Sequence, residues 1–203
     1  MSFLRKFTNQ KLMSPPKWLP DNLAYECMMG SRAYGCHNED SDYDIYGFAM
    51  PPKHMLFPHL TGVVKGFDPE PDLDKPSYTA EAIKSPAHNN LPFSFTIYPV
   101  SRYFKLCMDN NPNMLDSMFV PESCITCSTD AARIVLDNRK KFLSKEVWPR
   151  YRNYAAQQIK KLKNASELPE VKVIREFEDK FNISHTTTIE EVKEELKNRG
   201  LVV

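Results

Sequence analysis

The sequence predicts an α+β fold, because strand-like segments gather in its first half and helical patterns fill its second half. Three segments have strand character, at residues 25–29, 43–50 and 93–98. Apolar residues recur at helical spacing from residue 100 onward. Strands first and helices later are typical of α+β domains and not of repeating βαβ folds. The 203 residues suit one domain, or one domain with a small appendage.

The first half is expected to alternate short elements with irregular chain. Apolar residues within 2–13 predict a short helix, which prolines end. The strand at 25–29 ends at Gly30, and the strand at 43–50 ends at a pair of prolines. Nine prolines or glycines among the forty-one residues of 51–91 predict a long loop or insertion before the third strand.

The second half of the chain is predicted to be mainly helical. An apolar face predicts a helix at 100–108, and Thr188 with Glu191 forms a capping box for a final helix. We divide the chain into an α+β core at 1–127, which includes the 51–91 loop, and a helical C-terminal part at 128–203. The remaining predicted helices cover residues 114–119, 129–138, 145–163 and 168–181.

Composition excludes several classes of protein. Hydrophobic residues make up 41% of the chain and charged residues 26%, which is ordinary for a globular domain. No apolar run approaches the roughly 18 residues of a membrane span. Residues 1–13 also lack the apolar core of a secretory signal. Five scattered cysteines argue against a disulfide framework. We therefore expect a cytoplasmic protein without a membrane partner.

Two aspartates at the second predicted strand indicate a metal site. Asp42 and Asp44 are two residues apart, and side chains in a strand alternate, so both carboxylates share one face. Neighbouring carboxylates repel each other, and a divalent cation removes that cost. Mg²⁺ prefers such oxygen ligands and leaves room for substrate phosphates. Upstream, Gly30 lets the backbone approach a phosphate closely, and the Ser31 hydroxyl can donate to it.

A glycine-serine pair after a strand, followed by an SDxD motif, resembles the signature of the DNA polymerase β-like nucleotidyltransferase superfamily. The form found here looks closest to the predicted nucleotidyltransferases associated with RNA repair in bacteria and phages. The resemblance covers about residues 25–163. The matching segments are 30–35 (GSRAYG), 41–45 (SDYDI), 96–98 (TIY), 110–113 (NNPN), 142–145 (FLSK) and 154–158 (YAAQQ).

The resemblance implies a fold, a reaction and a set of site residues. The fold is the minimal nucleotidyltransferase catalytic core, a short mixed sheet flanked by helices. Gly30 and Ser31 would hold the β- and γ-phosphates of an NTP, and Asp42 and Asp44 would bind Mg²⁺ or Mn²⁺. The reaction would transfer an NMP to an acceptor hydroxyl, on RNA or a tRNA end, and release pyrophosphate.

One position departs from the family's pattern. The family has a third aspartate on the strand before the Thr-Ile-Tyr segment, where it completes the metal site and can help to deprotonate the attacking hydroxyl. Counting back from Tyr98, that position holds Ser94. Serine is neither an anionic ligand nor a base at neutral pH. Either activity is impaired, or another acid supplies the third ligand, or the chain has been altered at this position. The acids of the 51–91 loop that could serve, if it folds inward, are Asp68, Glu70, Asp72 and Asp74.

Three further features have alternative interpretations. The Arg32 guanidinium, next to Ser31, could pair with a triphosphate or form a structural salt bridge. His37, in the loop before the aspartates, could touch a nucleotide or have no role. Cys124 and Cys127 have a zinc-like spacing, but no second pair lies at zinc-ribbon distance, so we interpret them as ordinary strand cysteines.

A basic segment lies between residues 139 and 163. Its only acid is Glu146, although the whole chain has 27 basic and 26 acidic residues and a formal net charge of +1. The segment is either a solvated helix face or a groove for a triphosphate or a nucleic acid, in which aromatic side chains stack on bases. Its nine basic residues are Arg139, Lys140, Lys141, Lys145, Arg150, Arg152, Lys160, Lys161 and Lys163.

These observations favour a metal-dependent nucleotidyltransferase that acts on RNA. Two alternatives remain open. Ser94 suggests a nucleotide- or RNA-binding module on a catalytically impaired transferase scaffold. The same chemistry could instead nucleotidylate a protein or a small molecule.

Overall fold

The computed structural model of the chain describes residues 2–62 and 75–166. Its two compact units are Met1–Arg150 and Tyr151–Val203. The helices expected at 168–181 and from residue 188 lie outside the described residues. In the part of the chain that is described, no helix is long and apolar enough to cross a membrane.

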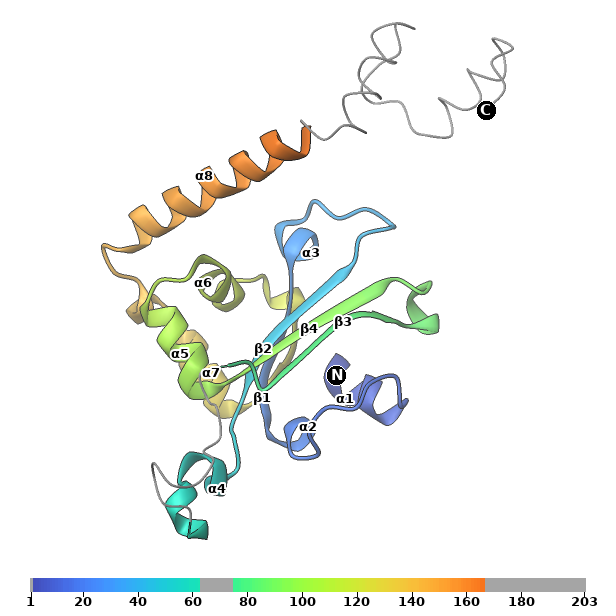
Figure 1. Ribbon diagram of the computed structural model, residues 1–203, viewed down its shortest axis with the longest axis vertical. Coiled ribbons are helices and arrows are strands. Elements are labelled where there is room, and N and C mark those ends of the chain that lie inside the picture. The colour runs from blue at the N-terminus through green and yellow to red at the C-terminus, as the bar shows by residue number, and fades with distance from the viewer. Residues whose placement is uncertain (1, 63–74, 167–203) are drawn as a thin grey trace, which may run out of the picture. The chain divides into compact units, whose positions relative to one another are not determined.

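A mixed five-stranded sheet forms the centre of the first unit, with the strand order β3-β4-β2-β1-β5 (Figure 1). Strands β2 and β4 run parallel, while β1 pairs antiparallel with β2 and β5, and β3 pairs antiparallel with β4. The α+β prediction is therefore confirmed. The strands are β1 Leu23–Met29, β2 Tyr43–Ala49, β3 Tyr78–Lys84, β4 Pro92–Pro99 and β5 Ile125–Ser128.

Helices α1, α2, α5 and α6 of the first unit lie on the faces of this sheet (Figure 1). The α-helices are α1 Phe3–Asn9, α2 Leu19–Asn22, α3 Gly30–Tyr34, α4 Lys53–Leu56, α5 Val100–Met108, α6 Pro112–Met118, α7 Asp130–Asp137 and α8 Val147–Ser166. The described residues also form short 3₁₀ turns, at η1 Pro58–Thr61, η2 Pro86–His88, η3 Glu122–Cys124 and η4 Arg139–Phe142.

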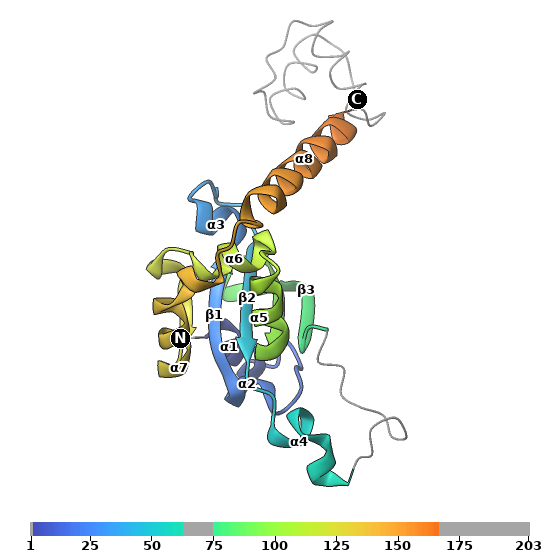
Figure 2. The same cartoon turned by 90° about the vertical axis from the view of Figure 1, so that its left-hand side faces the viewer.

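The alternation of side chains along β2 and β4 separates two faces. On one face, Ile45, Phe93 and Phe95 are buried against Leu4 and Phe7 of α1. On the other face, Phe48 contacts Tyr103 of α5, with ring centroids 4.9 Å apart. Figure 1 and the turned view in Figure 2 show α1 and α2 on one side of the sheet and α5 and α6 on the other. Strand residues that alternate with the α1-facing ones, such as Asp44 and Ser94, therefore share the α5–α6 face.

A buried carboxylate fixes α1 to the sheet. Glu26 of β1 has no exposed surface and accepts hydrogen bonds from the Phe3 amide at 2.7 Å and the Leu4 amide at 2.9 Å. The hydroxyls of Ser2 and Thr126 donate to the same carboxylate. Because a buried charge needs such partners, Glu26 holds the first turn of α1 in one place.

Most expected elements form close to their predicted positions, but the 51–91 segment differs. It contains β3, at the edge of the sheet, and the short helix α4, so the segment is not irregular throughout, as the prediction of a long loop or insertion had it. The sequence of β3 is rich in Ala, Glu and Lys, which have low strand propensity, so its pattern is weak. The compact units divide between Arg150 and Tyr151, whereas the sequence predicted a division after residue 127; α7 packs on β1 and β5.

Candidate active site

The candidate site begins where β1 ends and β2 starts. Met29 pairs with Asp44 across these antiparallel strands, and Gly30 follows Met29 directly. Gly30 has a φ of +64°, and a Cβ atom at this position would lie 2.5 Å from the Asp44 Oδ2 atom. The Asp44 carboxylate therefore lies against the backbone of Gly30, in space that any other side chain would fill.

The two aspartates interact electrostatically. Asp44 is partly buried, and this burial, together with the negative charge of Asp42, raises the pKa of the Asp44 carboxyl above its ordinary value. Asp42 lies immediately before β2 and is exposed. The charge of Asp42 thus disfavours ionisation of Asp44, and a divalent cation beside Asp44 would reverse that effect. The donor set, two carboxylates beside an open glycine, fits a hard cation such as Mg²⁺.

Ser94 stands beside Asp44 in the sheet. The parallel register pairs Asp44 of β2 with Ser94 of β4, and neighbouring strands lie about 4.8 Å apart. A hydroxyl thus occupies the sheet position next to Asp44. Among the residues that the structure describes, no three His, Cys, Asp or Glu side chains lie close enough together to hold a metal ion. The acids from Asp68 to Asp74, named above as substitutes, lie outside the described residues.

Arg32 connects α3 to the beginning of β2. Its Nη2 donates to the Ser41 carbonyl at 2.6 Å, and its Nε donates to the Asp42 carbonyl at 3.0 Å. Its guanidinium carbon also lies 3.5 Å from the centre of the Tyr43 ring. The sequence offered a triphosphate partner or a salt bridge for Arg32, and the bonds formed here are to backbone carbonyls and an aromatic face. Arg32 thereby fixes the backbone of Asp42.

Other motif residues support the site from a distance. The Tyr34 hydroxyl donates to the Asp116 carboxylate at 2.6 Å and ties α3 to α6. Asn110, which is buried, donates to the Ser144 hydroxyl and accepts from the Ser144 amide, so two of the matching segments meet. Sequence spacing gave no signal for the Tyr34–Asp116 bond, because the two residues are 82 positions apart.

Residues of β2 line two cavities, although neither Asp42 nor Asp44 is among the lining residues. One, of about 560 Å³, is lined by Arg32 and Tyr43 together with residues of the loop before β2, including His37. The other, of about 210 Å³, lies on the face of the sheet that carries Asp44. Its lining includes Tyr46 and Tyr98 from the strands, and Arg102, Asn111 and Asn113 from α5 and the segment that follows it.

The cysteines take ordinary structural places. Cys124 is buried, and its thiol donates to the Arg32 carbonyl at 3.9 Å. Cys127 lies in β5, where burial raises the pKa of its thiol. Only Cys127 is therefore a strand cysteine as expected, because Cys124 is the last residue of η3.

The predicted basic segment spans η4 and most of α8. Arg152, Lys160 and Lys161 are exposed, and Trp148 has 73% of its surface exposed. The two compact units divide within this segment, between Arg150 and Tyr151. That the segment lines the same cleft as Asp42 stays a prediction.

Comparison with known proteins identifies one family. The model of RlaP, described as the RNA repair pathway DNA polymerase beta family, matches residues 4–177. This match spans the sheet, the Gly30 turn and both aspartates. The search of curated proteins found no match. The search of solved structures found none either.

Proposed function

Because the chain belongs to the RNA repair pathway DNA polymerase beta family, we propose that it transfers a nucleoside monophosphate from an NTP to an acceptor hydroxyl. The observation that carries this proposal is the close approach of the Asp44 carboxylate to Gly30, with Asp42 near enough to raise its pKa. A cation that binds together with the phosphates of a nucleotide would offset the unfavourable interaction between these two carboxylates.

In this proposal Asp42 and Asp44 hold Mg²⁺ or Mn²⁺ on the α5–α6 face of the sheet. The bound ion would supply positive charge that neutralises the polyphosphate and orients it. Gly30, which has no side chain, lets the β- and γ-phosphates approach the backbone, and the Ser31 hydroxyl donates to a phosphate oxygen. Arg32 keeps Asp42 at its place by holding its carbonyl.

The chemical step is an in-line displacement at the α-phosphate. The acceptor oxygen forms a bond to the α-phosphorus and releases its proton to water, while the bond from the α-phosphorus to the bridging oxygen breaks and pyrophosphate leaves. Little covalent chemistry is asked of the protein, so positioning and charge stabilisation provide most of the acceleration. The 210 Å³ cavity lined by Tyr46 and Tyr98 lies on the same face and is a candidate place for part of the nucleotide.

We propose RNA, such as a tRNA end, as the acceptor. The family description supports a role in RNA repair, and the basic segment at 139–163 supplies nine cationic side chains. Ser94, a hydroxyl beside Asp44, favours the second candidate, a module that binds nucleotide or RNA without efficient transfer. A protein or small-molecule acceptor is a third candidate for the same site.

One experiment separates these functions. The full chain is incubated with labelled NTPs, Mg²⁺ or Mn²⁺, and total RNA or cell lysate. Label on RNA supports the proposed function, label on protein or on a small molecule supports the third candidate, and NTP binding without transfer supports the second. Asp44→Asn is the control, because it should abolish both metal-dependent binding and labelling. A chain that neither binds nor transfers any NTP would overturn the proposal.

A further inference from the structure

We propose that Glu81, on the edge strand β3, supplies the third carboxylate of this site in place of Ser94. The inference rests on the proposed function, because it concerns the same metal site. It differs from the expectation that an acid between Asp68 and Asp74 would serve, because it draws on a residue of the sheet.

The pairing of β3 with β4 places an irregularity opposite Ser94. Thr79 pairs with Thr96 and Ala80 with Phe95, but the next pair joins Ile83 to Phe93. Two residues of β3, Glu81 and Ala82, therefore stand opposite one residue of β4. Ala82 has a φ of +54°, which accommodates the extra residue. Such β-bulges occur at sheet edges and beside active sites, where they redirect a side chain.

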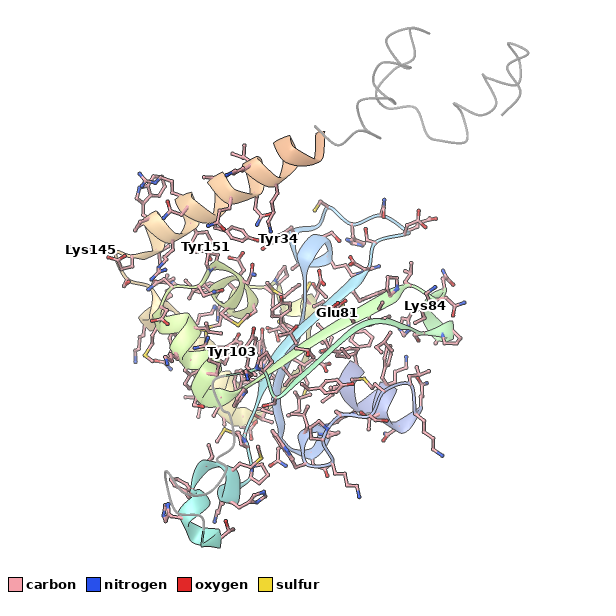
Figure 3. The ribbon with its side chains drawn as sticks, viewed as in Figure 1. Tyr34, Glu81, Lys84, Tyr103, Lys145 and Tyr151 are labelled. Carbon is pink, nitrogen blue, oxygen red and sulfur yellow. The ribbon has the colours of Figure 1, made fainter. Side chains whose placement is uncertain are left out.

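Alternation along β3 places Glu81 on the correct face. Ile83 packs with the core on the α1 side of the sheet, and Ala80 pairs with Phe95, which belongs to that core. Thr79 pairs with Thr96, which alternates with Phe95 and so lies on the α5–α6 face. Glu81 is two residues beyond Thr79 and shares this face with Ser94 and Asp44. Figure 3 labels Glu81 on β3.

The distances across the sheet suit a glutamate. Ser94 lies one strand from Asp44, and Glu81 lies one strand further, so about 10 Å separates the two outer backbones. Glutamate is one methylene longer than aspartate, and the side chain of Ser94, which stands between the two strands that carry Glu81 and Asp44, is short. Glu81 is exposed, so its side chain is free to turn inward when a cation binds. The described residues contain no preformed three-acid cluster, which agrees with a ligand that is recruited by the ion.

No other acid of these two strands competes for this role. Glu81 is the only Asp or Glu in β3 and β4. A charged residue on an edge strand also discourages pairing with another chain, but that role requires neither this face nor the position opposite Ser94. The experiment must therefore measure the metal itself.

The test is a titration of the full chain with Mn²⁺ alone, in which isothermal titration calorimetry measures the affinity. Glu81→Gln should weaken Mn²⁺ binding by about tenfold or more, because loss of even a group that only supports a metal ligand typically costs about 10- to 100-fold in affinity. Glu81→Asp keeps the charge but shortens the reach, so it should weaken binding as well. In the double variant Glu81→Gln/Ser94→Asp, the affinity should return. Asp137→Asn, an exposed carboxylate on α7 beside the opposite edge strand, is the charge-matched control and should change nothing.

Three other results are possible, and each contradicts one specific claim. If Glu81→Gln binds Mn²⁺ like the unchanged chain while Asp44→Asn does not, Glu81 is not a ligand and the proposed function stands. If Glu81→Asp binds normally and only Glu81→Gln is weakened, Glu81 acts through its charge and not as a ligand. If Asp44→Asn itself binds Mn²⁺ normally, the proposed metal site fails and this inference fails with it.

Discussion

Gly30 combines a left-handed backbone conformation with a close contact to the carboxylate of Asp44. Gly30→Ala would place a methyl group 2.5 Å from the Asp44 Oδ2 atom at a φ of +64°. Gly35→Ala is a matched control, because Gly35 has a φ of +72° but open space around its Cβ position. We expect Gly35→Ala to lower the free energy of unfolding by about 1–2 kcal/mol. Gly30→Ala should cost about 1–3 kcal/mol more, because the Asp44 side chain must move.

Denaturant unfolding of both variants checks this prediction, and Mn²⁺ titration extends it. Gly30→Ala should also weaken Mn²⁺ binding, since Asp44 is displaced, whereas Gly35→Ala should leave the affinity close to that of the unchanged chain. Equal losses of stability in the two variants would show that the contact between Gly30 and Asp44 is not close in solution.

The raised pKa of Asp44 makes a prediction about stability and pH. Its pKa is higher in the folded chain than in the unfolded chain, so the free energy of unfolding decreases as the pH rises from the ordinary aspartate value of about 3.9 through the folded value. Asp44→Asn or Asp42→Asn should therefore leave the metal-free chain as stable as before, or more stable, at neutral pH. For Asp44→Asn, the advantage should shrink below the ordinary aspartate pKa.

The measurement is denaturant unfolding at neutral and acid pH in the presence of a chelator. Adding Mg²⁺ with an NTP should then stabilise the unchanged chain and neither variant, because ligands that bind the folded state raise its stability. A metal-free Asp44→Asn chain that is clearly less stable at neutral pH would contradict the interpretation of the two aspartates as a repulsive pair.

At the scale of elements, the connection from α3 to β2 depends on Arg32. Arg32→Lys removes the planar group that binds the Ser41 and Asp42 carbonyls and stacks on Tyr43, and a single ammonium cannot reproduce that geometry. We expect weaker binding of Mn²⁺ alone, because Asp42 is less firmly positioned. If Arg32 instead binds a triphosphate directly, NTP affinity will fall while Mn²⁺ affinity without nucleotide stays the same. Arg133→Lys, at the exposed ion pair with Glu122, is the control.

The same elements show what sequence reasoning can and cannot reach. The apolar face of residues 100–108 predicted α5 with its observed bounds, because that pattern is local. That Asp42 and Asp44 share a face stays a prediction, because Asp42 lies just before the first residue of β2. The strand β3 was missed because four of its seven residues, two Ala, one Glu and one Lys, have low strand propensity, and because the extra residue of its bulge interrupts the alternation between Glu81 and Ile83. The neighbours of Ser94 could not be predicted from the sequence either, because the pairing of β4 with β2 and β3 depends on sheet order and register.

At the scale of the whole molecule, charge is distributed unevenly along a nearly neutral chain. The formal net charge is +1, yet nine bases and one acid lie between residues 139 and 163. Each phosphate neutralised by a protein cation releases counterions, so RNA binding through this segment must weaken as salt rises. Trp148, which is largely exposed, and the tyrosines of α8 add flat surfaces on which bases can stack.

Charge reversal within this segment tests its role. Lys160→Glu/Lys161→Glu changes two exposed side chains of α8, and should reduce the slope of log affinity against log salt for single-stranded RNA by about 1.4, at about 0.7 for each lost phosphate contact. Lys11→Glu/Lys17→Glu changes the net charge equally, at two exposed positions outside the segment, and should leave the slope nearly unchanged. Fluorescence anisotropy with a labelled RNA measures both. Equal losses in the two double variants would mean that overall charge, and not this segment, attracts RNA, and unchanged binding in both would identify the segment as a solvated helix face.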